Sequence, residues 1–239
     1  MTYFLTSSTV LGRSAVLNPA NGFVEALCKA LPGERKGLFI CSDPEGHQRT
    51  DAFAASVRES FEGAGIAVAS LDVLDGRNRD KAEELVAGAD LIVLAGGHVP
   101  TQNRFFAEIG LAGLLKSWPG VLVGISAGSM NAAREVYAQP EEEGEAISPD
   151  YQRFLPGLGI TGTVLLPHYQ MVKDEMVDGL RLFEDITIPD SLGKTFYAIP
   201  DGSYLLGQNG REELRGEAWR IRDGEMEQVG AEGDVLLLV

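Results

Sequence analysis

A serine stands between small residues at the end of an apolar run. Residues 124–128 have the sequence GISAG, which fits the pattern GxSxG. A strand-like run precedes it, and we expect a helix to begin near Ser129. In a nucleophile elbow, this strand-to-helix turn forces strained backbone angles on the serine and presents its hydroxyl at the rim of a sheet. The pattern predicts Ser126 as a nucleophile; a tight turn that needs small residues for packing is the alternative.

The same turn predicts where a developing negative charge would be held. The N-terminus of the following helix directs free backbone N–H groups and a partial positive charge toward an oxyanion at Ser126. The backbone N–H of Ala127 is the first expected donor.

A nucleophilic serine needs a base, and the chain has three histidines. His47 lies in the polar segment SDPEGHQRTD, which predicts a surface loop. His98 follows two glycines at the end of LIVLAGG, where it could bind substrate or cap a loop. His168 ends the apolar run TVLLPHY. We therefore predict His168 as the base, with a structural histidine as the alternative.

The imidazole of such a base needs a carboxylate to orient it. Asp201 lies in the turn IPDGS at the end of the apolar run TFYAIP. Glu135, in the helix expected after Ser126, and the acidic cluster 141–145 compete for this role. An aspartate before glycine is also an ordinary turn former, so the residues by themselves leave the acid open.

The elements that must position these residues alternate between strands and helices. Apolar runs predict strands, and apolar residues at spacings of three and four predict helices. This alternation predicts an α/β fold with a mostly parallel sheet flanked by helices on both faces, with ligands bound at the carboxyl ends of the strands. The expected strands are Tyr3–Thr6, Leu38–Cys41, Ile66–Leu71, Leu91–Ala95 and Val121–Ile125, and the expected helices are Asn21–Leu31, Asp51–Glu62, Asp80–Ala87 and Thr101–Ser117.

The last third of the chain differs in composition and in its pattern of apolar residues. After Tyr137 the sequence QPEEEGEAISPDYQRF predicts a long loop that is solvated at the surface or closes over the site. A helix is expected over Lys173–Asp185. Short strands follow, which we expect to be antiparallel at one edge of the sheet: Thr195–Ile199, Ser203–Leu206, Ala218–Ile221 and Met226–Val229, the last two joined by a hairpin turn at RDGE. Without repeats or linkers, residues 1–239 are interpreted as a single domain.

Composition excludes several classes of function. The 239 residues include 20 Lys and Arg against 35 Asp and Glu, a net charge of −15, which disfavours nucleic acid and membranes as partners. The chain has no apolar run of the length of a spanning helix and no secretion signal at its start, so we expect a cytoplasmic protein. Cys28 and Cys41 share no ligand spacing with the histidines, so we expect no metal and no cofactor.

Four motifs in order, AGGHVPTQN, GISAGS, LLPHY and IPDGS, resemble the serine peptidase family of aspartyl dipeptidase (peptidase E) and cyanophycinase. The resemblance implies a fold akin to class I glutamine amidotransferases, a flavodoxin-like three-layer arrangement, with serine in place of their cysteine. It implies Ser126, His168 and Asp201 as the triad, and Gly97 N–H beside Ala127 N–H in the oxyanion hole. The chain departs from the family in having Asp201 where aspartyl dipeptidases have glutamate.

A second departure is His98, which stands where the family usually has asparagine and could contact the substrate. The resemblance implies a cytoplasmic serine exopeptidase, a dipeptidase that cleaves short peptides, including those with N-terminal Asp, through an acyl-enzyme on Ser126. An acidic side chain would need a nearby cation. The candidates are Arg104, Arg134, Arg153 and Lys173, and the sequence does not choose among them; it also leaves the oligomeric state open.

Three other functions fit parts of the sequence. An esterase of the α/β-hydrolase type would place its acid between Ser126 and His168, at Glu135, Glu141 or Asp150. A glutaminase would use cysteine at the turn. A non-catalytic member of the fold would bind a metabolite or a partner at the same rim, and a serine-directed fluorophosphonate probe would then fail to label Ser126.

Overall fold

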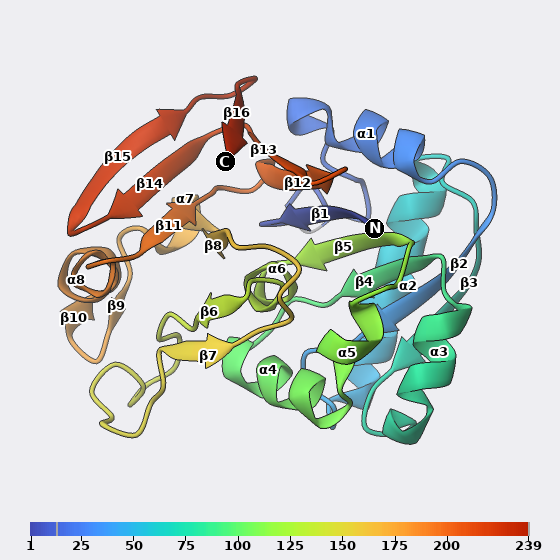
Figure 1. Cartoon of the computed structure of the whole chain (residues 1–239), viewed down its shortest axis with the longest axis horizontal. Coiled ribbons are helices and arrows are strands. Elements are labelled where there is room, and N and C mark those ends of the chain that lie inside the picture. The colour runs from blue at the N-terminus through green and yellow to red at the C-terminus, as the bar shows by residue number, and fades with distance from the viewer. Residues whose placement is uncertain (13, 239) are drawn as a thin grey trace.

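The computed structural model describes residues 1–12 and 14–238, and in these ranges its largest sheet has eight strands (Figure 1). The five strands expected in the first half of the chain run parallel, and three later strands extend the sheet beyond β1 in antiparallel pairs. The predicted sheet is therefore confirmed. In spatial order its strands are β16 (Val235–Leu238), β13 (Arg211–Arg215), β12 (Tyr204–Gln208), β1 (Thr2–Thr6), β5 (Val121–Ile125), β4 (Leu91–Leu94), β2 (Arg35–Ile40) and β3 (Val68–Leu74).

Helices cover both faces of this sheet, as predicted (Figure 1). One face packs against α1 (Phe23–Ala30), which follows the short 3₁₀ helix η1 (Ala20–Gly22), and α2 (His47–Gly63). The other face packs against α3 (Ala82–Gly88), which follows η2 (Arg79–Lys81), and against α4 (Val99–Glu108) and α5 (Leu111–Leu115). Neighbouring strand residues alternate between the two layers because successive side chains point to opposite faces: Phe39 packs with α1 and α2, and Leu38 with the other helices.

Two predicted helices differ in their extent. The helix expected over Thr101–Ser117 is divided at Gly110, which has φ of 64° and so ends α4 in a left-handed turn. The helix expected from Asp51 begins at His47, so the segment predicted as a surface loop supplies the first turn of α2. Among the described residues, no helix combines the length and the apolar character needed to cross a bilayer.

A second sheet of four strands stands beside the first (Figure 1). Its order is β15 (Glu225–Gly230), β14 (Ala218–Arg222), β11 (Thr195–Ala198) and β8 (Val164–Leu166). The predicted hairpin is confirmed, because Asp223 and Gly224 turn the chain with positive φ between β14 and β15. The strands after residue 195 are thus divided between two sheets, whereas the sequence predicted that they would all lie at one edge of a single sheet.

The helix predicted over Lys173–Asp185 is wrong. This segment contains a small hairpin, β9 (Met176–Val177) and β10 (Leu180–Arg181), and then the π-helix η3 (Leu182–Thr187) and α8 (Ile188–Asp190). Asp178 and Gly179 both have positive φ, so this Asp-Gly pair makes a hairpin turn where the apolar spacing suggested a helix. A further strand pair, β6 (Glu135–Tyr137) and β7 (Phe154–Pro156), encloses the acidic loop.

Close packing of a glycine sets the position of the short helix α6 (Ala127–Asn131). A Cβ added at Gly128 would lie 2.5 Å from the carbonyl oxygen of Leu94 at the end of β4. Since real contacts are not that short, the glycine lets α6 lie directly against the sheet. The turn that precedes α6 is held in place by this contact.

We expect Gly128→Ala to lower the free energy of unfolding by about 1–3 kcal/mol, because an added carbon in a packed contact forces the backbone to shift. Gly113→Ala is the matched control, since Gly113 is also helical and a Cβ there would meet no atom within 4 Å. That control should be neutral or stabilising by up to about 1 kcal/mol. Urea unfolding of both variants checks this; equal effects would contradict the packing role of Gly128.

Candidate active site

Ser126 occupies a strained turn at the carboxyl end of β5. Its backbone has φ of 49° and ψ of −112°, in a region that residues with a side chain rarely adopt. A hydrogen bond to the neighbouring strand holds the turn: Ser126 N–H donates to the carbonyl oxygen of Thr6 at the end of β1 (3.0 Å). The neighbours of Ser126, Ile125 and Ala127, are buried, while Ser126 itself is partly accessible. The predicted strand–serine–helix arrangement is present.

The glycines after β4 lie beside this turn. A Cβ added at Gly96 would be 3.3 Å from Ser126 Cβ, and one at Gly97 would overlap the hydroxyl of Ser42. Gly97 has φ of 153° and is exposed, so its backbone is available to a ligand. In the described part of the chain, neither Gly97 N–H nor Ala127 N–H donates a hydrogen bond, which leaves both predicted oxyanion donors free.

The two other predicted residues meet in the second sheet. The adjacent parallel strands β8 and β11 end at Leu166 and Ala198, and His168 and Asp201 follow these ends by a few residues. His168 Nδ1 lies 2.8 Å from Asp201 Oδ1. Because parallel strands that pair in register bring their carboxyl ends to one edge, the two turns come into contact. The structure therefore brings His168 and Asp201 together.

Ser7, which the sequence did not single out, also belongs to this pair. It follows Thr6 at the end of β1 and is completely buried. Its hydroxyl donates to Asp201 Oδ1 (2.6 Å), accepts from His168 N–H (2.7 Å) and lies 3.3 Å from His168 Nδ1. Within the described residues, the ring of His168 forms hydrogen bonds through Nδ1, so Nε2 is left to a hydroxyl or a substrate.

The carboxyl of Asp201 is held in its ionised form. Burial raises its pKa, but hydrogen bonds from His168 and Ser7, together with the charge of His168, outweigh this effect and lower the pKa below its usual value. The backbone N–H of Asp201 donates to Gln170 Oε1 (3.0 Å), which fixes the turn. At neutral pH Asp201 is therefore an acceptor for the imidazole N–H.

A hollow of about 680 Å³ opens between the ends of β2 and β4 and the first turn of α2. Its lining includes Gly96, which lies against Ser126, but neither Ser126 nor His168 is among the lining residues. Backbone from 95–98 forms one wall, and Phe39 and Phe53 contribute apolar surface. Arg49 is the cation in this lining, and it pairs with Asp43 at 2.8 Å. Arg49 was not among the cations predicted from the sequence, because its segment was interpreted as a surface loop.

The acidic loop lies against this hollow rather than away from it. Glu145 Oε1 is 2.8 Å from His98 Nε2, and Glu145 Oε2 accepts the N–H groups of Glu141 and Glu142. Asp178 on the β9–β10 turn accepts two further N–H groups of the loop. Both interpretations of this segment hold in part: Glu141 and Glu142 are exposed to solvent, as expected of a surface loop, and they also line the hollow.

His98 stands at the start of α4 and also lines the hollow. Its Nδ1 is 2.8 Å from Thr101 Oγ1, and its Nε2 is occupied by Glu145. Both ring nitrogens are thus engaged with protein groups, and His98 holds the acidic loop. Its contact with a substrate stays a prediction.

The carboxyl of Glu141 has an unusual environment. Although Glu141 is exposed at the molecular surface, desolvation by the protein groups around its carboxyl raises the pKa of Glu141 to about 7. The charges of Glu145 and Glu142 add to this rise, and those of His98 and His168 oppose it. Glu141 therefore lies within electrostatic reach of both His98 and His168.

One cluster has the ligand types of a metal site: atoms of His98, Glu142 and Glu145 lie within 4.8 Å of one another. Two of these residues already form the hydrogen bond that anchors the loop, and the second oxygen of Glu145 accepts two backbone N–H groups. A metal ion would have to displace these contacts. The cluster is explained by the attachment of the loop.

The competing acids and cations are engaged elsewhere or exposed. Glu135, one of the acids considered for an esterase triad, forms an ion pair with Lys194 and not with His168. Arg153 forms two hydrogen bonds to Asp190. The remaining predicted cations, Arg104, Arg134 and Lys173, are exposed and do not line the hollow.

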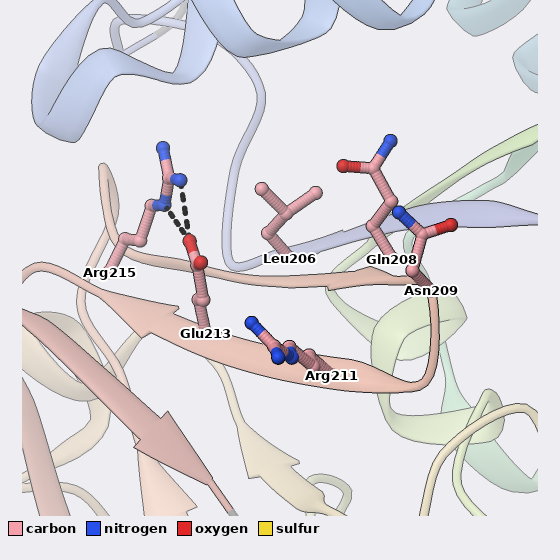
Figure 2. A pocket seen from close by; sticks show the side chains of 6 residues that line it. All are labelled: Leu206, Gln208, Asn209, Arg211, Glu213 and Arg215. Carbon is pink, nitrogen blue, oxygen red and sulfur yellow. Dashed lines mark hydrogen bonds and ion pairs between the residues drawn. The ribbon is translucent and has the colours of Figure 1, made fainter.

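A separate hollow of about 390 Å³ lies along β12 and β13 (Figure 2). Its lining includes Arg211 and Arg215, and Figure 2 shows Arg215 turned toward Glu213, with which it forms an ion pair. None of the predicted site residues lines this hollow. Gly97 and His98, by contrast, line the hollow at the ends of β2 and β4.

Comparison with known proteins identifies the fold and the family of the chain. None of the curated proteins matches the chain. A solved peptidase from an acI-B1 actinobacterium is 19% identical, with a TM-score of 0.70 over 99% of this chain and 96% of its own. A putative peptidase E protein from Listeria monocytogenes EGD-e is 16% identical, with a TM-score of 0.54 over 97% and 98% of the two chains.

At these identities the likeness to solved structures concerns the fold, and it confirms the expected peptidase E-like architecture. The family is identified by sequence, because the model of peptidase family S51 matches residues 3–214, nearly the whole chain. The strained serine turn and the paired histidine and aspartate lie inside this match. The chain belongs to peptidase family S51 and is a serine peptidase.

Proposed function

We propose that the protein is a dipeptidase that cleaves short peptides with Ser126 as nucleophile, His168 as base and Asp201 as the group that orients the base. The observation that supports this most is the His168–Asp201 contact of 2.8 Å, next to the β1 end that also holds the Ser126 turn. The order nucleophile, histidine, acid along the chain favours this assignment over an α/β-hydrolase esterase.

The steps follow from these positions. His168 Nε2 takes the proton of Ser126 as the hydroxyl oxygen attacks the scissile carbonyl, and Asp201 stabilises the imidazolium that forms. The free N–H groups of Gly97 and Ala127 receive the negative charge on the carbonyl oxygen. The proton passes from His168 to the leaving amine, and water then hydrolyses the acyl-enzyme by the same route.

The size and the charge of the hollow bear on the substrate. Its volume of about 680 Å³, with the acidic loop along one side, suits short peptides. Arg49 is placed to attract the carboxylate of an N-terminal Asp, whereas Glu141, Glu142 and Asp43 oppose it. A cytoplasmic place of action remains part of the proposal and is supported by the free thiols of Cys28 and Cys41.

Ser126→Ala should lower the hydrolysis of dipeptides by at least about 10⁴-fold, because the acyl-enzyme can no longer form. Release of free amino acids from a panel of dipeptides that differ in the N-terminal residue measures this. A fluorophosphonate probe should label the wild type at Ser126 and fail with the variant. Ser191→Ala, which removes a buried hydroxyl outside the site, serves as control. A wild type that neither cleaves nor becomes labelled would support a binding role instead.

Asp201→Asn should lower kcat by about 10²- to 10⁴-fold with little change in KM. The amide of asparagine can donate to His168 Nδ1, which would place the ring proton on Nε2 and remove the base. Asp201→Glu keeps a carboxylate and should retain much more activity than the asparagine variant. Steady-state kinetics on the best dipeptide decide this; wild-type kcat in Asp201→Asn would rule out Asp201 as the orienting acid.

The preference for an acidic N-terminal residue should fall as pH rises through 7. With its pKa raised to about 7, Glu141 is neutral below that pH and anionic above it, where it repels an aspartate side chain. We expect the ratio of kcat/KM for Asp-Leu over Ala-Leu to fall by about 2- to 10-fold between pH 6 and 8.

Glu141→Gln should abolish this fall, because its side chain stays neutral. Glu143→Gln is the matched control, since Glu143 is an exposed neighbour that does not line the hollow. The same pH dependence in wild type and Glu141→Gln would show that Glu141 does not face the N-terminal side chain.

A further inference from the structure

The end of β1 touches both halves of the proposed catalytic site. The carbonyl oxygen of Thr6 accepts from Ser126 N–H (3.0 Å) and from Ser129 Oγ (2.8 Å). The next residue, Ser7, contacts His168 and Asp201. These two halves follow strands of different sheets, β5 in one and β8 with β11 in the other. Two consecutive residues thus contact both halves of the proposed site.

The hydroxyl of Ser7 both donates and accepts a hydrogen bond. A serine hydroxyl has one proton, and here it is donated to Asp201 Oδ1 at 2.6 Å. Its oxygen accepts from His168 N–H at 2.7 Å, and the residue is completely buried. Water does not reach Ser7 from the surface, so the side chain cannot exchange these partners without a local opening.

These bonds also decide which nitrogen of His168 has the proton. The ionised Asp201 is an acceptor, and the Ser7 proton is already used, so the 2.8 Å contact between Nδ1 and Asp201 requires a proton on Nδ1. The lone pair is then on Nε2, which is the tautomer that a general base needs. The bond to His168 N–H further holds this residue in its left-handed conformation, with φ of 59°.

We propose that Ser7 is a positioning residue of the peptidase, which joins the His168–Asp201 pair to the β1 end that holds the Ser126 turn. This inference rests on the proposed triad. Ser7 does not touch the reacting atoms; it acts through the orientation and the tautomer of His168. The expected effect of its loss is therefore on the rate of the chemical step and not on binding.

The test uses a fluorophosphonate probe on the intact protein, so that it does not depend on the peptide preference. In labelling, Ser126 Oγ forms a bond to phosphorus, fluoride leaves, and His168 takes the hydroxyl proton. Ser7→Ala should lower the labelling rate constant at saturating probe by about 10- to 100-fold, with the half-saturating probe concentration within about twofold of wild type. An unchanged rate constant would overturn the proposal.

Ser191→Ala is the matched control for stability. Ser191 is also completely buried, and its hydroxyl donates to Ile188 O (2.7 Å) and accepts from Gly224 N–H (2.9 Å). Urea unfolding should show similar losses for both variants, whereas the labelling rate should fall in Ser7→Ala and stay within about twofold of wild type in Ser191→Ala. Equal labelling losses would mean that Ser7 is merely structural.

Two further variants separate this inference from the proposed function. His168→Ala should label far more slowly than wild type, and a wild-type rate in this variant would contradict the proposed triad. If His168→Ala labels slowly but Ser7→Ala labels at the wild-type rate, the triad stands and only the proposed role of Ser7 is wrong. Should Ser7→Ala fail to fold, Ser7→Cys keeps the shape but donates weakly. We expect it to label at least fivefold more slowly, and a wild-type rate would overturn the proposal.

Discussion

Hydrogen bonds at the end of β1 hold both halves of the proposed catalytic site. Thr6 accepts the N–H of Ser126, and Ser7 binds the pair His168 and Asp201. The nucleophile follows a strand of one sheet and the paired histidine and aspartate follow strands of the other, so the proposed site depends on how the two sheets pack together. A buried hydroxyl with fixed partners is costly to disturb, because each broken bond leaves a polar group without solvent.

Strained backbone is concentrated at the same place. Ser126 and His168 both have positive φ, at 49° and 59°, and both have their N–H groups bound by the β1 end. Residues with side chains keep such angles when the surrounding structure determines them. At this site, the backbone angles are held by the hydrogen bonds from the end of β1 and by the close contact of Gly128 with Leu94.

A second set of contacts, between Glu145, His98 and the acidic loop, influences the charge of the carboxyl groups at the hollow. Desolvation raises the pKa of Glu145, but the N–H groups of Glu141 and Glu142 and the His98 ring outweigh this effect and lower it. Glu145 can therefore anchor the acidic loop as an anion while Glu141, with its raised pKa, faces the hollow. In a chain with a net charge of −15, the lining of this hollow thus combines the carboxylates of Asp43, Glu141 and Glu142 with the cation of Arg49.

The alternation of strands and helices, the serine turn, and the positions of His168 and Asp201 after strand ends could all be predicted from the amino-acid sequence. Local patterns suffice for these features, because apolar periodicity and turn residues act over a few positions. The second sheet, the hairpin at Asp178, and the contacts of Ser7 and Glu145 became apparent only in the folded chain. Ser7 and Glu145 lie 161 and 47 residues from the histidines that they contact. Contacts at such separations depend on how sheets and loops pack, and an isolated serine or glutamate has no local pattern that reveals its partner.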